Sequence, residues 1–281
     1  MAELLPSLPL ETRCPPLPLR RYNGFWLPES VLTELPAIHA RLEPRPSDVF
    51  LASFPKSGTT WLKALAFATA HRATHPPSDA GHPLRRMNPH ECVQFMEMDP
   101  ELRRDTGSLL EEFAQLASPR VLATHLPYCL LPESITAGEG AAASRVVYVC
   151  RNPKDAFISY WEASMRRPKQ VLFLEYERML RDPEATVKKL AEFMGCGFSK
   201  EEEEGGVVDE IVKLCSLKEL KNMEVNRSGG NQAGVRNDAY FRKGSSGDWR
   251  NHLTPEMARR LDKIVEEALH GSGFAFVDDG I

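Results

Sequence analysis

Four short apolar segments constrain the fold of this chain more than any other feature of its sequence. They occupy residues 49–54, 120–124, 145–150 and 171–176 and are rich in Val, Leu, Phe and Tyr. None of them alternates strictly between apolar and polar residues, which is typical of strands that are buried on both faces of a parallel sheet. Helical patterns separate or follow them. This order predicts an α/β fold with helices flanking a central parallel sheet.

Two of the predicted helices are marked by their ends. Asp182 followed by Pro183 is typical of an N-cap with proline at the first helical position, and Gly195 marks the end of that helix. Thr254 and Pro255 repeat the same start near the C-terminus. We therefore predict one helix between residues 183 and 194 and another that begins at residue 255.

Composition and proline distribution predict one domain preceded by an arm. The 281 residues are 42% hydrophobic and 26% charged, as in a globular protein that buries a core without disulfides. Residues 1–46 hold nine of the 22 prolines. We expect an extended, proline-rich N-terminal arm there, which lays aromatic residues on the body, and a single domain over residues 47–281.

Charge and cysteine usage exclude some classes of function. The net charge is −4, so the chain has no global basic field of the kind that nucleic-acid-binding proteins carry, and anion binding requires a local site. The six cysteines form no Cys-x-x-Cys pair, which favours a reducing compartment. Pro6, Pro9 and Glu11 interrupt any signal-peptide core. We predict a cytoplasmic protein that binds neither nucleic acid nor membranes.

The strongest local signal is Phe54-Pro-Lys-Ser-Gly-Thr-Thr-Trp61, where an apolar strand leads through a polar loop into a helix. In this context backbone N–H groups and the helix dipole bind an anion. The order differs from the Gly-x-x-x-x-Gly-Lys-[Ser/Thr] phosphate loop, because Lys56 precedes the glycine. An ordinary strand-to-helix corner would also explain Ser, Gly and Thr. It gives no reason for a lysine, so we expect Lys56 to face a ligand.

Two further segments place cations beside turns. Residues 148–159 lead another apolar strand into a polar turn and a helix, with Arg151 and Ser159 eight residues apart. That spacing is a little over two helical turns, so both side chains can bind one phosphate. Residues 241–249, Phe-Arg-Lys-Gly-Ser-Ser-Gly-Asp-Trp, supply adjacent cations and two glycines. Taken alone, the last segment is as easily a basic surface loop.

Together these segments resemble the cytosolic sulfotransferase family, which transfers the sulfuryl group of 3′-phosphoadenosine 5′-phosphosulfate. The resemblance extends from about Tyr22 to the C-terminus, and Ala123-Thr-His-Leu-Pro-Tyr128 and Leu217-Lys-Glu-Leu-Lys look like the plant branch. It implies that residues 47–281 form a sulfotransferase domain with a nucleotide-kinase-like phosphate-binding loop. It also implies a small hydrophobic hydroxylated acceptor. A homodimer is left open.

The resemblance further implies a role for each site residue. The loop from Lys56 to Thr60 would hold the 5′-phosphosulfate, and Trp61 would stack on the adenine. The residues expected to contact the nucleotide are Lys56, Ser57, Gly58, Thr59, Thr60, Trp61, Arg151, Ser159, Tyr176, Cys215, Ser216, Leu217, Arg242, Lys243 and Gly244. Of these, Arg151, Ser159, Arg242, Lys243 and Gly244 would bind the 3′-phosphate, and Tyr176 and residues 215–217 would line the adenine pocket.

Two residues carry the expected chemistry. His125 would act as general base toward the acceptor hydroxyl, since a neutral histidine can take its proton as attack develops. Lys56 would meet the negative charge that develops on the leaving bisphosphate. No metal is expected, because the histidines at 71, 75, 82 and 90 lie in a proline-containing stretch without ligand spacing.

The chain departs from the family pattern after Ser159. Family members usually carry a few dozen additional residues between the helix that bears this serine and a Tyr-Trp-x-x-Ser helix, and here the two motifs are fused at Tyr160-Trp161. The omitted region helps to wall the acceptor pocket. A second departure is Ala123, where many animal members have lysine.

Two alternatives to an active sulfotransferase remain open. The first is a nucleotide-binding homologue with little or no turnover, because the acceptor wall is shortened. The second is a nucleotide kinase, which shares the strand-loop-helix phosphate site and needs magnesium with an Asp or Ser/Thr ligand for it. The sequence does not identify the acceptor, because the residues that select it lie on variable loops.

Overall fold

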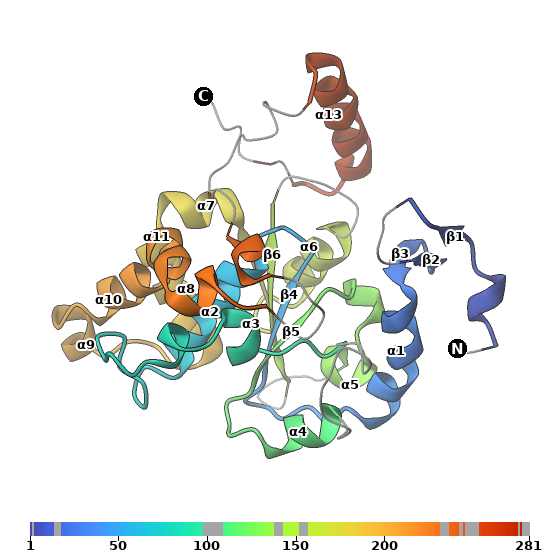
Figure 1. Cartoon of the computed structure of the whole chain (residues 1–281). Coiled ribbons are helices and arrows are strands. Elements are labelled where there is room, and N and C mark those ends of the chain that lie inside the picture. Colours follow the sequence, from blue (N-terminus) through green and yellow to red (C-terminus); the bar gives the residue numbers. More distant parts are fainter. Residues whose placement is uncertain are drawn as a thin grey trace.

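The four apolar segments form one parallel sheet with the strand order β5-β4-β6-β7 (Figure 1). The strands are β4 (Val49–Ser53), β5 (Val121–Thr124), β6 (Arg145–Cys150) and β7 (Val171–Glu175). The computed structural model describes residues 1, 3–13, 18–97, 109–137, 143–151, 157–230, 236–241, 244, 253–274 and 276. Every residue of β4 and β5 is buried, so the predicted α/β fold with a central parallel sheet is confirmed.

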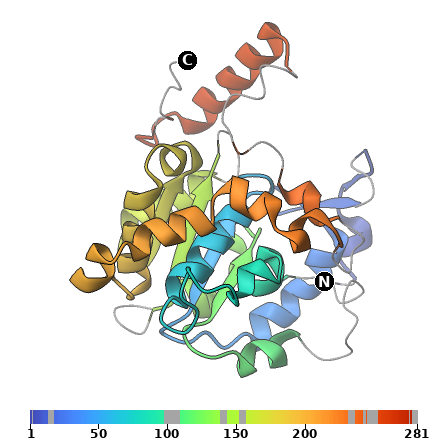
Figure 2. The ribbon, with the colours of Figure 1, turned by 60° about the vertical axis from the view of Figure 1, so that its left-hand side comes forward.

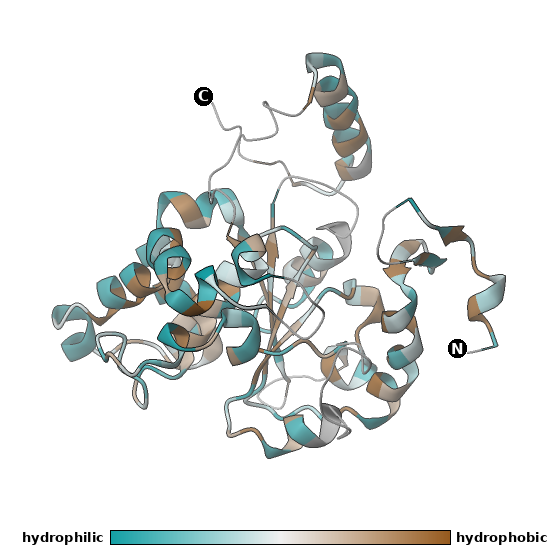
Figure 3. Cartoon of the chain, viewed as in Figure 1, coloured by the Kyte–Doolittle hydropathy of each residue, from teal (hydrophilic) through white to brown (hydrophobic). Residues whose placement is uncertain are grey.

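Helices cover both faces of this sheet (Figures 1 and 2). Alternate residues of β4 enter two apolar clusters: Leu51 packs with α2, α8, α10 and α11, and Phe50 packs with α1, α5 and α6. Figure 3 shows the central strands mostly in hydrophobic colours, between helices on which hydrophilic and hydrophobic residues are mixed. The α-helices are α1 (Glu29–Arg41), α2 (Thr59–Ala70), α3 (Pro89–Cys92), α4 (Leu109–Gln115), α5 (Glu133–Thr136), α6 (Phe157–Arg166), α7 (Tyr176–Arg181), α8 (Pro183–Met194), α9 (Lys200–Glu204), α10 (Val207–Leu214), α11 (Leu217–Asn222), α12 (Glu224–Arg227) and α13 (Pro255–Leu269), and short 3-10 helices span Leu5–Ser7, Pro83–Arg85, Tyr128–Leu130 and Asn237–Tyr240.

The helix ends predicted from proline and glycine are confirmed. The Asp182 side chain accepts a hydrogen bond from the Ala185 N–H at 2.9 Å, and Gly195 ends α8 with a φ of 75°. Thr254 caps α13 in the same way, through the Met257 N–H at 3.2 Å. Helix α13 projects from the body in both views (Figures 1 and 2).

The N-terminal segment is less extended than we expect from its prolines. Strands β1 (Leu10–Glu11), β2 (Leu19–Tyr22) and β3 (Phe25–Pro28) form a small antiparallel sheet. Residues 29–41 then form α1, although Pro36 lies inside this helix. Leu32, Leu35 and Ile38 are buried in the cluster that also contains Phe50, and their burial outweighs the cost of an internal proline.

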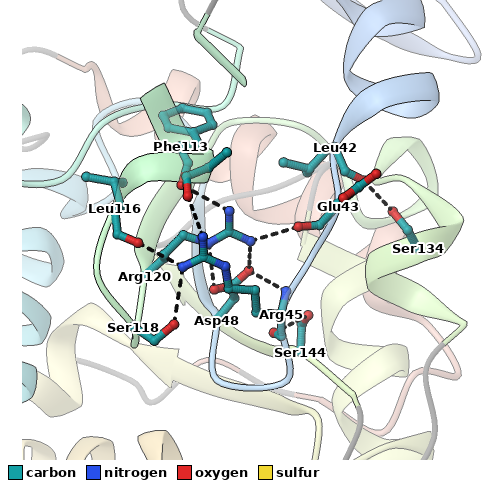
Figure 4. A network of polar contacts seen from close by, with 11 residues as sticks. Leu42, Glu43, Arg45, Asp48, Phe113, Leu116, Ser118, Arg120, Ser134 and Ser144 are labelled. Carbon is teal, nitrogen blue, oxygen red and sulfur yellow. Dashed lines mark hydrogen bonds and ion pairs between the residues drawn. The ribbon is translucent and has the colours of Figure 1, made fainter. Parts of the chain in front are cut away.

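A buried ion pair joins the starts of β4 and β5 (Figure 4). Arg120 donates from Nε to Asp48 Oδ1 at 2.9 Å, and its Nη2 also contacts Asp48 Oδ2. The remaining guanidinium N–H groups reach the carbonyl oxygens of Phe113 and Glu43, and the Arg45 N–H donates to Asp48. The two charges are therefore paired and hydrogen-bonded, as burial of charge requires.

Candidate functional site

The carboxyl ends of all four parallel strands meet at one cavity of about 450 Å³. Lys56 follows β4, His125 follows β5, Arg151 follows β6, and Tyr176 follows β7, and all four line this cavity. Ligands of open α/β sheets bind outside the carboxyl ends of the strands, because the strand-to-helix loops converge there. The sheet topology thus brings together residues that are far apart in the sequence.

The loop between β4 and α2 has a strained, tightly packed backbone. Lys56 has a φ of 67°, which is uncommon for a residue with a Cβ, and Gly58 has a φ of 107° at the N-cap of α2. A Cβ on Gly58 would lie 2.6 Å from the Tyr176 ring. The glycine is therefore required both by its backbone conformation and by the close approach of the tyrosine. The first N–H groups of an α-helix have no partner within the helix, so the start of α2 is of the kind that binds anions.

Aromatic and small residues form the other wall. The Trp61 and Tyr176 rings meet edge to face with centroids 5.6 Å apart, and Arg151 Cζ lies 4.9 Å from the Tyr176 ring centre. Gly244 has a φ of 62°, and a Cβ there would lie 2.3 Å from Leu217. This wall presents apolar surface next to a guanidinium, an arrangement that suits a base attached to a phosphorylated sugar.

Most of the predicted nucleotide residues that the structure describes converge on this cavity. Those that line it are Lys56, Gly58, Thr59, Thr60, Trp61, Arg151, Tyr176, Leu217 and Gly244, together with His125. Ser57 and Cys215 are buried and do not line it, and the Ser216 hydroxyl caps α11 by accepting from the Glu219 N–H at 3.2 Å. Arg242, Lys243 and the Ser159 side chain lie outside the described residues.

His125 is held in one tautomer by the chain around it. Its Nδ1 lies 2.7 Å from the Ser53 carbonyl oxygen, which can only accept, so Nδ1 carries the proton and Nε2 is the proton-accepting nitrogen. Burial, with a smaller contribution from the charge of Lys63, lowers the pKa of His125 to about 4, against the opposing hydrogen bond to the Ser53 carbonyl. The imidazole is therefore neutral at pH 7. Its backbone N–H donates to Glu97 Oε1, which fixes the start of the loop after β5.

The structure adds polar residues that the sequence reasoning did not assign to the site. His90 lines the cavity, and its Nε2 lies 2.9 Å from Thr60 Oγ1. Its Nδ1 lies 3.1 Å from the Nζ of Lys63, a fully buried residue of α2. The signal for Lys63 is a lysine inside an apolar helix, one turn after Thr60. The pairing with His90 spans 27 residues and depends on the fold.

Burial dominates the electrostatics beneath the cavity. It lowers the pKa of Lys63 well below the ordinary value, against the opposing charge of Glu97. It raises the pKa of Glu97 to about 7, and Glu97 Oε2 has no hydrogen-bond partner among the described residues. Two ionisable groups are therefore buried behind the cavity wall, where Lys63 contacts the lining residue His90.

Two kinds of feature are absent from the described part of the chain. No group of three or more His, Cys, Asp or Glu side chains there is arranged to hold a metal ion. No helix within those same ranges has the length and apolar character needed to span a bilayer.

Comparison with known proteins identifies the family. The family model described as the sulfotransferase domain matches residues 46–166 and 160–273. Cytosolic sulfotransferase 8 of Arabidopsis thaliana is 37% identical over 96% of this chain and 91% of its own length, and cytosolic sulfotransferase 17 is 40% identical over 97% and 89%. Family membership rests on these extended matches.

Solved structures share the fold. The crystal structure of an Arabidopsis thaliana protein, described as a candidate steroid sulphotransferase, superposes with a TM-score of 0.72 at 32% identity, over 98% of this chain and 94% of its own. Mouse sulfotransferase SULT7A1, solved with PAP, superposes with a TM-score of 0.64 at 24% identity, over 90% and 95%.

The same comparisons locate a missing segment. The two family matches overlap at residues 160–166, so both motifs of the family are matched by one stretch of this chain. The alignment with cytosolic sulfotransferase 8 runs over 309 positions, more than the 281 residues present here. The junction itself is packed: Tyr160 stacks on Tyr148 with centroids 4.1 Å apart and donates to the Leu126 carbonyl at 2.6 Å. The chain therefore belongs to the plant branch of the cytosolic sulfotransferase family, with an internal deletion that a single helix, α6, bridges.

Proposed function

We propose that the chain transfers the sulfuryl group of 3′-phosphoadenosine 5′-phosphosulfate to a hydroxyl of a small hydrophobic acceptor. The observation that carries this proposal is the single cavity that gathers the Lys56 loop, Arg151 and His125 at the strand ends. The curated relatives are named cytosolic sulfotransferases, which supports both the reaction and a cytosolic location. Mouse SULT7A1 and retinol dehydratase were solved with PAP, and retinol dehydratase also with retinol or androsterone, which supports the nucleotide and the acceptor class.

The described residues fit the nucleotide. Gly58 is the N-cap of α2, whose first N–H groups suit the 5′-phosphate end, and Lys56 adds a cation to the cavity lining there. Trp61 and Tyr176 supply aromatic surface for the adenine, and Arg151 lies beside them for the 3′-phosphate. When bound, this co-substrate supplies an activated sulfuryl group and a bisphosphate leaving group.

His125 is proposed as the general base. A base must be neutral before it accepts a proton, and the lowered pKa of His125 meets this condition across the physiological range. The bond to the Ser53 carbonyl directs the accepting lone pair to Nε2, and it also stabilises the imidazolium that forms when the acceptor loses its proton.

Lys56 is proposed to stabilise the charge that develops on the leaving group. Its left-handed backbone conformation lies in the short loop between the buried strand β4 and α2, and its side chain lines the cavity. Pre-placed charge of this kind needs no reorganisation during the reaction, and it typically contributes about 2.7–4 kcal/mol of transition-state stabilisation.

The missing segment favours a second candidate function, a nucleotide-binding homologue with little turnover. Most of the predicted nucleotide residues that the structure describes line the cavity, whereas the two overlapping family matches indicate that residues near position 160 are missing from this chain. An acceptor that is held about 1 Å away from the in-line position can react a hundredfold more slowly.

Calorimetry with adenosine 3′,5′-bisphosphate and a sulfonation assay on an acceptor panel test both functions. We expect micromolar binding, and we expect turnover to rise when the missing segment is grafted from a longer relative at residue 160. Equal turnover of the native and grafted chains would show that the segment is dispensable. Stabilisation by ATP with magnesium, without stabilisation by the bisphosphate, would favour a kinase instead.

A further inference from the structure

A buried lysine beneath the anion-binding loop has no role in the reaction described above. Lys63 lies one helical turn after Thr60 on α2, and its side chain is fully buried. Its Nζ lies 3.1 Å from His90 Nδ1 and 3.3 Å from the centre of the Phe95 ring. Lysines are almost never fully buried unless they are paired, because desolvating the ammonium group is costly. Packing alone therefore does not account for Lys63.

His90 connects this lysine to the cavity. Its Nε2 lies 2.9 Å from Thr60 Oγ1, and both His90 and Thr60 line the cavity. The His90 ring is held between Phe95 and Tyr240, with centroids 5.6 Å and 4.2 Å away. A continuous line of polar contacts thus runs from the core, through an imidazole in a fixed orientation, to a hydroxyl of the anion-binding loop.

The chemistry of Lys63, His90 and Thr60 determines which group donates and which accepts in each of these hydrogen bonds. When Lys63 is an ammonium group, which a bound anion favours against the lowering of its pKa by burial, it can only donate. His90 Nδ1 then accepts from Lys63, and the proton of the neutral ring lies on Nε2. Nε2 then donates to Thr60 Oγ1, which leaves the threonine O–H to donate into the cavity. Burial and the charge of Lys63 lower the pKa of His90, which keeps the ring neutral as this direction requires.

We propose that Lys63 and His90 are positioning residues for the anionic end of the sulfuryl nucleotide. They orient the Thr60 hydroxyl as a hydrogen-bond donor to the charged oxygens and place a cationic amine beneath them. This inference rests on the proposed function. A bound anion supplies Lys63 with a counter-charge in addition to the nearby carboxyl of Glu97, so the arrangement favours the occupied site over the empty one.

The polar contacts that run from Lys63 through His90 to Thr60 are called the relay below. A double-mutant cycle on bisphosphate affinity tests it. We expect Lys63→Met and Thr60→Val each to weaken the binding of adenosine 3′,5′-bisphosphate about tenfold, because each removes one charge-assisted step. In the Thr60→Val background, Lys63→Met should weaken binding by much less than tenfold, since the hydrogen-bonded path has lost its last group and only the longer-range charge of the lysine remains. Lys213→Met removes an exposed lysine from α10 and serves as the matched charge control, with affinity unchanged.

Other readouts separate the relay from simple packing. Replacing a buried amine by an apolar chain of similar length should leave the melting temperature of the ligand-free protein unchanged or higher, while affinity falls. His90→Phe keeps the ring contacts and should also lower the affinity for the bisphosphate about tenfold. His90→Gln retains an N–H for Thr60 and should keep part of that affinity. If Lys63→Met does not fold, His90→Phe with Thr60→Val completes the cycle.

The inference would be overturned if the losses of bisphosphate affinity in the two single variants simply added in the double variant. A fall in melting temperature that accompanies the loss of affinity in every variant would also overturn it. Either result would leave the proposed function intact if the wild-type chain binds the bisphosphate. Absence of binding by the wild-type chain would overturn the proposed function and this inference together.

Discussion

The two ends of β4 and β5 both carry buried ionisable side chains, but they differ in how these are paired. At the strand starts, Asp48 and Arg120 are paired with each other and hydrogen-bonded to the surrounding backbone (Figure 4). At the carboxyl ends, Lys63 contacts an imidazole and a ring face, and Glu97 leaves one oxygen without a partner among the described residues.

This difference suggests that the strand starts contribute to stability and the carboxyl ends of the same strands to ligand binding. The Asp48–Arg120 ion pair is fully hydrogen-bonded, so its energy should not change when a ligand binds at the other end of the strands. Incompletely paired groups behind a cavity wall cost stability in the free protein and recover it when a charged ligand binds. Changes at the strand starts should therefore alter unfolding, and changes at the carboxyl ends should alter catalysis and binding.

The largest effect is expected at the catalytic end. His125→Ala should lower kcat by about 10²–10⁴-fold, because the acceptor hydroxyl loses its base. Bisphosphate affinity should change little, because the proposed base acts on the acceptor. Steady-state kinetics and calorimetry measure the two quantities. If more than about a tenth of kcat survives, His125 is not the base; if binding and melting temperature fall together, its role is structural.

The next effect lies at the opposite end of the strands. Asp48→Ala leaves the buried Arg120 charge without its carboxylate, which should lower the free energy of unfolding by about 3–5 kcal/mol. Urea denaturation measures this change, and kcat per folded molecule should stay constant. The double variant Asp48→Leu/Arg120→Met removes both charges and should be more stable than the single one. A change in kcat for the folded protein would show that the two ends are coupled.

The third effect distinguishes charge from backbone strain at Lys56. Lys56→Ala and Lys56→Gly should both lower kcat by at least about a hundredfold, because both remove the cation that is proposed to face the leaving group. The glycine variant should be more stable than the alanine variant by about 1 kcal/mol, because the φ of 67° suits glycine. Steady-state kinetics of the two variants measures the loss of the charge, and thermal unfolding measures the backbone strain. A near-normal kcat in either variant would remove Lys56 from the mechanism.

Sequence reasoning predicted the parts of this comparison that depend on local pattern. The strands follow from apolar runs, and Lys56 follows from a lysine placed at a strand-to-helix corner where packing gives it no role. The helix at residues 29–41 was missed because Pro36 argues against it and only tertiary burial favours it. The domain boundary at residue 46 stays a prediction.

The parts that were missed depend on long-range contacts. The Cys215 side chain is buried in the core and the Ser216 hydroxyl caps α11, so the expected contact of these two residues with the adenine stays a prediction. The partnership of Lys63 with His90 leaves no pattern in the sequence, because the two residues lie on separate elements that only the fold brings into contact.

The smallest effect concerns the protonation of His125 in the ligand-free protein. Burial should hold its pKa near 4, and the Ser53 carbonyl should keep the proton on Nδ1. Because the native pKa lies below the ordinary value of about 6.5, the unfolded state binds the proton more tightly, and this group lowers stability as pH falls from 6.5 toward 4. Nitrogen-detected NMR of the imidazoles, assigned with His125→Gln, gives both the tautomer and the titration. A pKa near 6.5 or a proton on Nε2 would mean that the ring is solvated and free to turn. The difference between the fully paired strand starts and the incompletely paired carboxyl ends would then depend on Lys63 and Glu97 alone.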